Sequence, residues 1–320
     1  MRRLFCLLPI FVPALVLAQG RAAQHRLEAH AEVKKVLSGG NPQAALARLH
    51  YLGEEHYAAA MLTRAWEEIT AIELRRNVAQ VVAGLKDPSA ERFLMSLAAS
   101  DDSALRMSAA EGLGRLGSKK VEVLFPLLSD PSLGVRREAA RALGVSHLKK
   151  VGRPLIRAAM TEGEPEVRAA MLVAAGQSGD RRIAPQLASF LTHSSESARL
   201  ASAQGLCLLG DPKGFAYAKT LLESEDRYTR RQGVALFEGL PAKQSKPYLE
   251  PRLRDPDKHV SAAAARILYQ GGDASMLDWL VLASHLSRPE DKLIFEAELE
   301  RLMLTDERRK EILRQAGVVP

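Results

Sequence analysis

An apolar residue followed directly by arginine recurs along most of the chain at an almost constant spacing. The pairs are Leu74-Arg75, Leu105-Arg106, Val135-Arg136, Val167-Arg168, Ala198-Arg199 and Thr229-Arg230, and Val260-Ser261 is a degenerate copy. Successive pairs are 30 to 32 residues apart. A fixed period of this length indicates a repeat protein, in which one supersecondary unit recurs along the chain. We take the first residue of each pair as the anchor of a repeat and count other positions from it.

Small and apolar residues keep the same register after each anchor. In the copy that begins at Val135, small residues follow by four and five positions at Ala139-Ala140, and an apolar residue follows by eight at Leu143. Offsets of zero, four and eight lie on one face of an α-helix. A glycine that is expected to end this helix follows by twelve positions in most copies. It stands at Gly117, Gly179, Gly210 and Gly272.

A second apolar stretch with helical spacing lies between each glycine position and the next anchor. These stretches are 121–128, 183–191, 215–222, 248–253 and 276–282. Each unit is therefore predicted to be helix, turn, helix in about 31 residues. Because one such unit cannot bury its own apolar faces, neighbouring units must stack. We predict an all-α fold, an α-solenoid of about seven or more two-helix repeats.

The clearest copy, Asp130 to Gly144, has the pattern D-P-x-x-x-V-R-x-x-A-A-x-A-L-G. This pattern resembles HEAT repeats, in particular the short bacterial HEAT-like class also found in phycobilisome-lyase-type proteins, over about residues 70–285. The resemblance implies that the anchor-bearing helices line the concave face of the solenoid. It also implies that the arginine of each anchor pair bonds an acid in the turn before it. The acids placed suitably for this are Asp102, Asp130, Asp226 and Asp255.

The ends of the chain differ from the repeat array, which is assigned to residues 71–286. Residues 19–70 are predicted to form degenerate helical pairs around a turn at 38–42, and residues 287–320 a helical cap. A capping box from Ser287 to Glu290 is expected to begin this cap, and Gly317 to end its last helix.

Residues 1–18 have the form of a secretory signal peptide, with two arginines, an apolar run and small residues before Gln19. An uncleaved membrane anchor is disfavoured because the run is shorter than about 20 residues and contains two prolines. We therefore expect cleavage after Ala18 and an exported protein, either periplasmic or secreted.

Composition narrows the classes of function. Cleavage would leave Cys207 as the single cysteine, so no internal disulfide could form. It would also lower the formal charge from +7 to +5 by removing Arg2 and Arg3. A mild positive charge spread along an exported chain favours acidic partners or envelope surfaces over nucleic acid.

No motif in the sequence indicates a catalytic, cofactor or metal site. Gly112, Gly114 and Gly117 match a dinucleotide fingerprint, but they close a predicted helix instead of following a strand. The eight histidines lack metal-ligand spacing, and the His-Glu pairs of the di-iron proteins that resemble this family are missing. Cys207 falls on an apolar helix face and is predicted to be buried and inert. We expect no cofactor, no metal and no enzymatic activity.

The resemblance implies that residues two, three and six positions after each anchor point into the concave groove. The candidate partner-binding residues are Arg137, Glu138, Arg141, Leu200, Gln204, Arg231, Gln232 and Arg266. Small and apolar residues of the middle copies would form the floor of this groove, and exposed apolar patches with polar rims often mark binding sites. The alternative is that these small residues only let neighbouring helices pack closely.

These observations favour a non-catalytic protein–protein interaction scaffold or adaptor of the bacterial periplasm or cell envelope. Its partner would be another protein bound along the concave face. A second hypothesis is binding of nucleic acid or another polyanion through a basic concave surface, against which the export signal and the modest charge argue. A third is a HEAT-like lyase or ligand-binding protein, for which the sequence offers neither a pocket nor an activated residue.

Overall fold

The computed structural model describes residues 8–318, and for residues 8–19 the backbone alone. Within the described residues the ordered elements are α-helices and short 3-10 helices, with no β-strand. The fold is therefore an all-α solenoid of helical repeats, as predicted. Contacts divide the chain into two compact units, Met1–Leu148 (unit 1) and Lys149–Pro320 (unit 2).

Each unit is a succession of short helices. Unit 1 contains α1 (Leu8–Leu37), α2 (Pro42–Leu52), α3 (Glu55–Ala65), α4 (Ile72–Gly84), α5 (Glu91–Leu97), α6 (Ser103–Arg115) and α7 (Leu133–Val145). Its 3-10 helices are η1 (Trp66–Glu68), η2 (Pro88–Ala90), η3 (Val121–Leu124) and η4 (Pro126–Ser129). The α-helices of unit 2 are α8 (Gly152–Thr161), α9 (Pro165–Gln177), α10 (Ala184–Ser189), α11 (Glu196–Leu209), α12 (Pro212–Leu222), α13 (Arg227–Ala235), α14 (Ala242–Leu249), α15 (Lys258–Gln270), α16 (Ser275–Leu286), α17 (Pro289–Arg301) and α18 (Asp306–Gln315). Its 3-10 helices are η5 (Lys149–Val151), η6 (Arg181–Ile183), η7 (Phe190–Thr192) and η8 (Glu250–Arg254).

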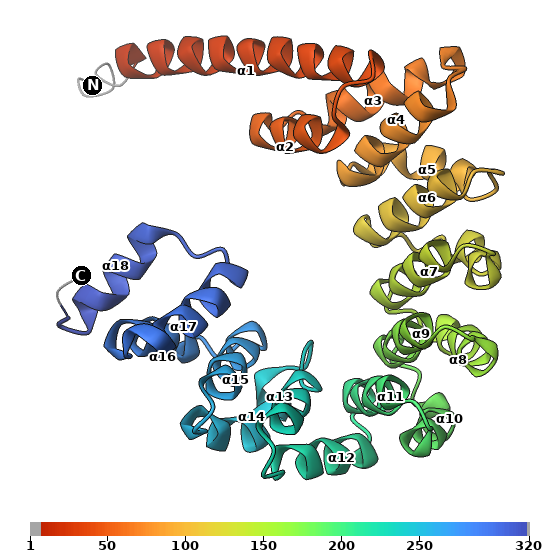
Figure 1. Ribbon diagram of the computed structural model, residues 1–320. Coiled ribbons are helices and arrows are strands. Elements are labelled where there is room, and N and C mark those ends of the chain that lie inside the picture. The colour runs from red at the N-terminus through yellow and green to blue at the C-terminus, as the bar shows by residue number, and fades with distance from the viewer. Residues whose placement is uncertain (1–7, 319–320) are drawn as a thin grey trace, which may run out of the picture. The chain divides into compact units, whose positions relative to one another are not determined.

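The helices of each repeat form two layers. We call the anchor-bearing helices α4, α6, α7, α9, α11, α13 and α15 the first helices, and the helical segment that follows each of them the second helix. In unit 2, α9 and α11 lie in one layer and α8 and α10 in the other (Figure 1). The predicted helix–turn–helix unit is thus confirmed, and it presents two different faces.

The core is built from the positions that the repeat register selects. The anchors Leu105, Val135, Val167, Ala198 and Val260 are all buried, whereas Leu74 and Thr229 are half-buried. The residues eight positions later are buried as well. They are Leu113, Leu143, Leu206, Phe237 and Leu268. Offsets of zero, four and eight therefore face the interior of the stack, as expected for one stripe of a helix.

The glycines at offset twelve end the first helices in the left-handed region. Gly117, Gly179 and Gly210 have φ values of 60°, 71° and 73°, a conformation that side chains with a Cβ rarely adopt. At Gly210 the backbone N–H bonds the carbonyl of Cys207, and the next N–H bonds that of Leu206. These bonds satisfy carbonyls that the helix leaves without partners.

Two glycines in unit 2 bring first helices into backbone contact. A Cβ atom on Gly176 of α9 would lie 2.4 Å from the Cα of Gly205 on α11. This close contact supports the alternative that the small residues of the middle repeats serve to let neighbouring helices pack closely. Ala169, Ala170 and Val173 on α9 are half-buried, and Ala201 on α11 is buried.

The second helices are less regular than the sequence predicts. Segments 215–222 and 276–282 lie in α12 and α16, as expected, but segment 121–128 forms the two 3-10 turns η3 and η4. Pro126 interrupts this segment, and a proline within a helix removes a backbone donor and clashes with the preceding turn.

The cap helices also differ in one detail. The expected capping box at Ser287 is wrong, because the N-cap of α17 is Arg288, which makes no side-chain capping bond. Glu290 therefore stands one position too early in the helix to complete the motif. Gly317 ends α18 with a φ of 71°, as predicted.

The anchor arginines bind the turn that precedes their own helix. Each donates to a backbone carbonyl six residues earlier, which holds the turn against the start of the helix. The pairs are Arg75 with Ile69, Arg106 with Ser100, Arg136 with Asp130, Arg168 with Glu162, Arg199 with His193 and Arg230 with Ser224.

We call the anchor arginines and the acids that they bond the arginine ladder. The acids that are bonded differ from those that the sequence analysis expected. Arg106 bonds Asp130 at 2.6 and 2.9 Å, and Arg230 bonds Asp255 at 2.9 Å. Both acids precede the next first helix instead of the arginine's own. The physical reason is that carbonyls of its own turn occupy one end of the guanidinium, so its other edge faces the next turn of the stack. Asp102 pairs with Arg76, and Asp226 caps α13 through the backbone N–H of Thr229.

The N-terminal helix α1 packs onto unit 1 from His25 onward. The Nδ1 atom of His25 lies 3.1 Å from the Leu52 carbonyl, and Arg26 pairs with Glu54 at 2.6 Å. Residues 20–24 are exposed. Of the predicted signal peptide, residues 1–7 lie outside the described residues. Among those described, no helix is long and apolar enough to cross a membrane.

The ladder makes stability sensitive to acid. The Arg106 guanidinium lowers the pKa of the Asp130 carboxyl below its usual value. A depressed folded-state pKa contributes stability above the unfolded value of about 3.9, and this contribution is lost as pH falls through the folded pKa. We expect Asp130→Asn to lower the free energy of unfolding by roughly 3 kcal/mol at neutral pH. The deficit should shrink when thermal unfolding is measured below about pH 4.

The matched control is Asp101→Asn, because Asp101 is an exposed neighbour whose side chain makes no ion pair in the described structure. Its melting temperature should follow that of the unmodified chain at every pH. A constant deficit for Asp130→Asn across the whole pH range would contradict the pairing.

Candidate partner-binding surface

The first helices α6 and α7 of unit 1 border a surface hollow of about 580 Å³, a volume within the usual range of ligand sites. Its lining residues are Lys86, Met107, Ala110, Glu111, Gly114, Arg115, Glu138, Arg141, Ala142 and Val145. Met107, Glu111, Glu138 and Arg141 stand at the offsets of two, three and six. The structure therefore brings these positions of two successive repeats together around one hollow.

The floor of the hollow is apolar and partly open to solvent. A Cβ atom on Gly114 would lie 3.0 Å from the Cβ of Ala142, so small residues let α6 and α7 approach closely. At the two ends of this contact, Met107 is 38% exposed and Val145 is 45% exposed. An exposed methionine adapts its shape to different partner side chains, and exposed apolar groups within a polar rim favour contact with another molecule.

The rim carries both signs of charge. Glu111 pairs with Arg115 at 2.8 Å on α6. On α7, the Oε1 atom of Glu138 lies 3.6 Å from Arg137 and 3.5 Å from Arg141. Lys86, from the turn after α4, has no carboxylate partner among the described residues. Arg141 is 68% exposed at its side chain, so its guanidinium is accessible for a further bond.

Four of the remaining candidate residues lie on neighbouring first helices of unit 2. Leu200 and Gln204 belong to α11 and are half-buried, and Leu200 packs against the core beneath it. Gln232 of α13 donates to Glu196 of α11 at 2.9 Å. Arg231 bonds Asp257 at 2.6 and 3.0 Å and contacts His259 of α15 at 2.9 Å. These side chains link α11, α13 and α15 across one face.

Arg266 does not lie where the sequence analysis expected it. It is 6% exposed and donates to Glu238, Gln270 and Glu298. The reason is that α17 of the cap brings the carboxylate of Glu298 over α15 and buries the guanidinium. Arg266 therefore joins the cap to the last repeat, and it does not present a basic flank to a groove.

Three residues of this surface were missed by the sequence analysis. Val145 stands ten positions after its anchor, which continues the helical series of offsets three and six, so the period could have found it. Lys86 lies in a turn with a φ of 57°, where no helical period applies. Tyr228 is 57% exposed, and its ring lies beneath the guanidinium groups of Arg227 and Arg231.

The cysteine of the described residues does not line the hollow. Cys207 is buried, and burial raises the pKa of its thiol to about 12, which keeps it protonated at neutral pH. No group of three or more potential metal ligands occurs among the described residues. Gly112, Gly114 and Gly117 close α6, where the sequence analysis expected a repeat end.

The two-layered stack of short helix pairs defines a helical-repeat solenoid. The family model of HEAT repeats matches residues 65–144 and 152–236, which together make up more than half of the chain. The chain therefore belongs to the HEAT repeat family.

Several solved structures are similar to this chain. The complex of CpcE and CpcF of phycocyanin lyase from Nostoc sp. PCC7120 is 19% identical, with a TM-score of 0.53 over 76% of this chain and 94% of that chain. An engineered protein is 17% identical, with a TM-score of 0.40 over 92% and 90% of the two chains. Escherichia coli YibA is 15% identical, with a TM-score of 0.39 over 79% and 97%. No curated protein sequence matches the chain.

The position of Arg266 leads to a test of stability. Arg266→Met removes the main partner of Glu298, a carboxylate that is 9% exposed. We expect a loss of about 3 kcal/mol in the free energy of unfolding, since removal of one partner leaves a buried charge. Arg301→Met is the control, because Arg301 also contacts Glu298 but is 63% exposed and should cost less than about 1 kcal/mol. Equal melting temperatures for the two variants would contradict a structural role.

Proposed function

We propose that this chain is a non-catalytic scaffold that binds another protein through the faces of its first helices. The observation that carries the proposal is the hollow between α6 and α7, with its apolar floor and charged rim. Met107 and Val145 offer apolar contacts at its floor, and Glu138 and Arg141 offer charged ones at its rim. Arg137 lies next to the rim, 3.6 Å from the Oε1 atom of Glu138. Protein interfaces combine these elements, and arginine is enriched among the residues that dominate their binding energy.

The charges of the rim favour a protein over a polyanion. Glu111 and Glu138 also line the hollow and pair with its cations Arg115 and Arg141, and a carboxylate there repels a phosphate backbone. A protein partner can place cations against these acids and acids against Arg141 or Lys86. Leu200, Gln204, Arg231 and Gln232 form a second candidate contact surface, within unit 2. Arg266 is left out, because it is buried.

We also propose that the chain is exported to the bacterial periplasm or beyond the cell. Residues 1–18 have the form of a signal peptide. In support, among the described side chains of α1, which begin at Gly20, the first to bond another element is that of His25. Cleavage after Ala18 would therefore leave all of these contacts in the mature chain.

Affinity capture tests the partner surface. The tagged chain is mixed with a bacterial envelope extract and mildly cross-linked, in parallel with two double variants. Arg137→Glu with Arg141→Glu reverses the rim charge of the hollow, whereas Arg64→Glu with Arg92→Glu reverses two exposed cations on α3 and α5. We expect a stoichiometric protein partner that is lost, by tenfold or more, only with the first variant, since charged interface groups cost about 1.4 kcal/mol or more.

Equal capture by both variants would remove these residues from the binding surface. Circular dichroism melting of each variant separates loss of binding from loss of folding.

The N-terminal proposal has its own measurement. We expect the chain expressed in a bacterium to lose 18 residues, so that mass spectrometry of the envelope fraction finds Gln19 as the first residue. A substitution of Ala18 by a bulky residue, such as Ala18→Leu, should block this processing. A cytoplasmic protein that keeps residues 1–18 would overturn the proposal of export.

A further inference from the structure

Basic side chains gather at the starts of the second helices in unit 2. Seven lysines and arginines stand in or just before the first turns of α8, η6, α12 and α14, and an eighth, Lys246, lies in the last turn of α14. All eight are exposed. We call them the basic edge. They are Lys149, Lys150, Arg153, Arg181, Arg182, Lys213, Lys243 and Lys246. Because they occupy the same place in successive repeats, the fold brings them to one side of the stack.

The acids on this side of unit 2 bond other groups of the chain itself. Asp180 is 2% exposed and pairs with Arg182 at 2.7 Å. Asp211 caps α12 through the backbone N–H of Lys213, and Asp273 pairs with Lys246 at 3.0 Å. Asp180 and Asp273 therefore neutralise two of the eight cations. Four of the others make no ion pair among the described residues, namely Lys149, Arg153, Lys213 and Lys243.

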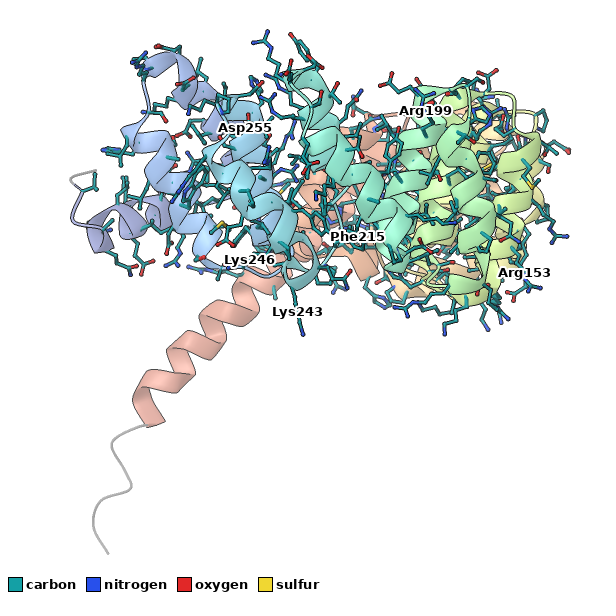
Figure 2. The ribbon with its side chains drawn as sticks, turned by 90° about the horizontal axis from the view of Figure 1, so that it is seen from below. Arg153, Arg199, Phe215, Lys243, Lys246 and Asp255 are labelled. Carbon is teal, nitrogen blue, oxygen red and sulfur yellow. The ribbon has the colours of Figure 1, made fainter. Side chains whose placement is uncertain are left out.

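The opposite side of the same unit has a different electrostatic character. Figure 2 shows Arg153, Lys243 and Lys246 along one side, and Arg199 and Asp255 of the arginine ladder along the other. There the guanidinium of Arg230 neutralises Asp255 at 2.9 Å, with both side chains largely buried. The ladder cations are bonded within the fold, whereas Lys149, Arg153, Lys213 and Lys243 of the basic edge are exposed and make no ion pair in the described part of the chain.

We propose that the basic edge binds the anionic headgroups of a lipid membrane surface. Clusters of four to eight lysines and arginines bind anionic bilayers electrostatically. This cluster has eight exposed members, of which Arg182 and Lys246 pair with acids of the chain itself. A row of cations along the side of a repeat stack can approach a flat surface together. This surface is separate from the first-helix faces assigned to a protein partner, so one chain would hold its partner at the membrane.

The aromatic residues near the edge favour lipid over single-stranded nucleic acid. Proteins that bind unpaired bases stack them on exposed rings between their cations. Phe215 and Tyr248 follow the cations of α12 and α14 along the chain, but both are half-buried. Their rings stack on each other with centroids 5.4 Å apart. They therefore stabilise the core and offer no platform for bases.

Vesicle co-sedimentation of the full chain tests this proposal. The probes are vesicles of equal parts phosphatidylglycerol and phosphatidylcholine, and neutral vesicles of phosphatidylcholine alone. The edge variant is Arg153→Gln with Lys213→Gln and Lys243→Gln. Its matched control, Arg254→Gln with Lys258→Gln and Arg288→Gln, also removes three cations of unit 2, from the end of η8, the start of α15 and the N-cap of α17.

The unmodified chain should bind the anionic vesicles in preference to the neutral ones, and lose them at high salt. Each charge near an anionic surface strengthens binding about fivefold, so the edge variant should bind roughly a hundredfold more weakly, and the control at most a few fold. Neutral vesicles report any binding through the apolar N-terminal segment, which both variants retain.

Two results would overturn the proposal. One is equal loss of vesicle binding in the edge variant and the control, which would show that binding depends on net charge and not on the position of the cations. The other is loss of retention on random-sequence duplex DNA in the edge variant while its vesicle binding is unchanged, which would make the edge a nucleic-acid surface.

Discussion

Burial of apolar side chains between neighbouring repeats is the constraint on which this structure depends. Each helix pair offers one apolar stripe on its first helix, and a single pair has nothing to cover that stripe. Val135 and Leu143 are fully buried only because adjacent repeats supply the covering side chains. The arginine ladder follows from the same stacking. Each anchor arginine bonds the turn of its own repeat, and Arg106 and Arg230 also bond the acid before the next first helix, which holds these successive turns in register.

Stacking also determines which side chains are left for function. With one stripe of each first helix used for the core, its remaining face lies open, and the hollow between α6 and α7 forms where two such faces meet. Short helices ending at Gly179 and Gly210 place the start of each second helix on one side of unit 2. The basic residues of these turns therefore collect there. A protein-binding face and a charged edge arise from different positions of the same repeat.

Part of the candidate surface was predictable because it depends only on helix geometry. Glu138 and Arg141 line the hollow, and a period of 3.6 residues places neither of them on the buried stripe of offsets zero, four and eight. Arg266 has a comparable offset and is buried. Its environment is decided by Glu298, which belongs to a cap helix 32 residues further along. The spacing of residues along α15 therefore could not predict that Arg266 is buried.

The sequence by itself determined the all-α class, the register of the repeats and the glycines that end the first helices. These properties depend on interactions within about 31 residues, and the chain repeats them several times. The tertiary structure alone decided which acid each arginine bonds, the close contact of Gly176 with Gly205 and the hollow above Met107. These depend on how one repeat approaches the next, because distances between backbones are set by side-chain packing across the interface and not by the spacing of residues along either helix.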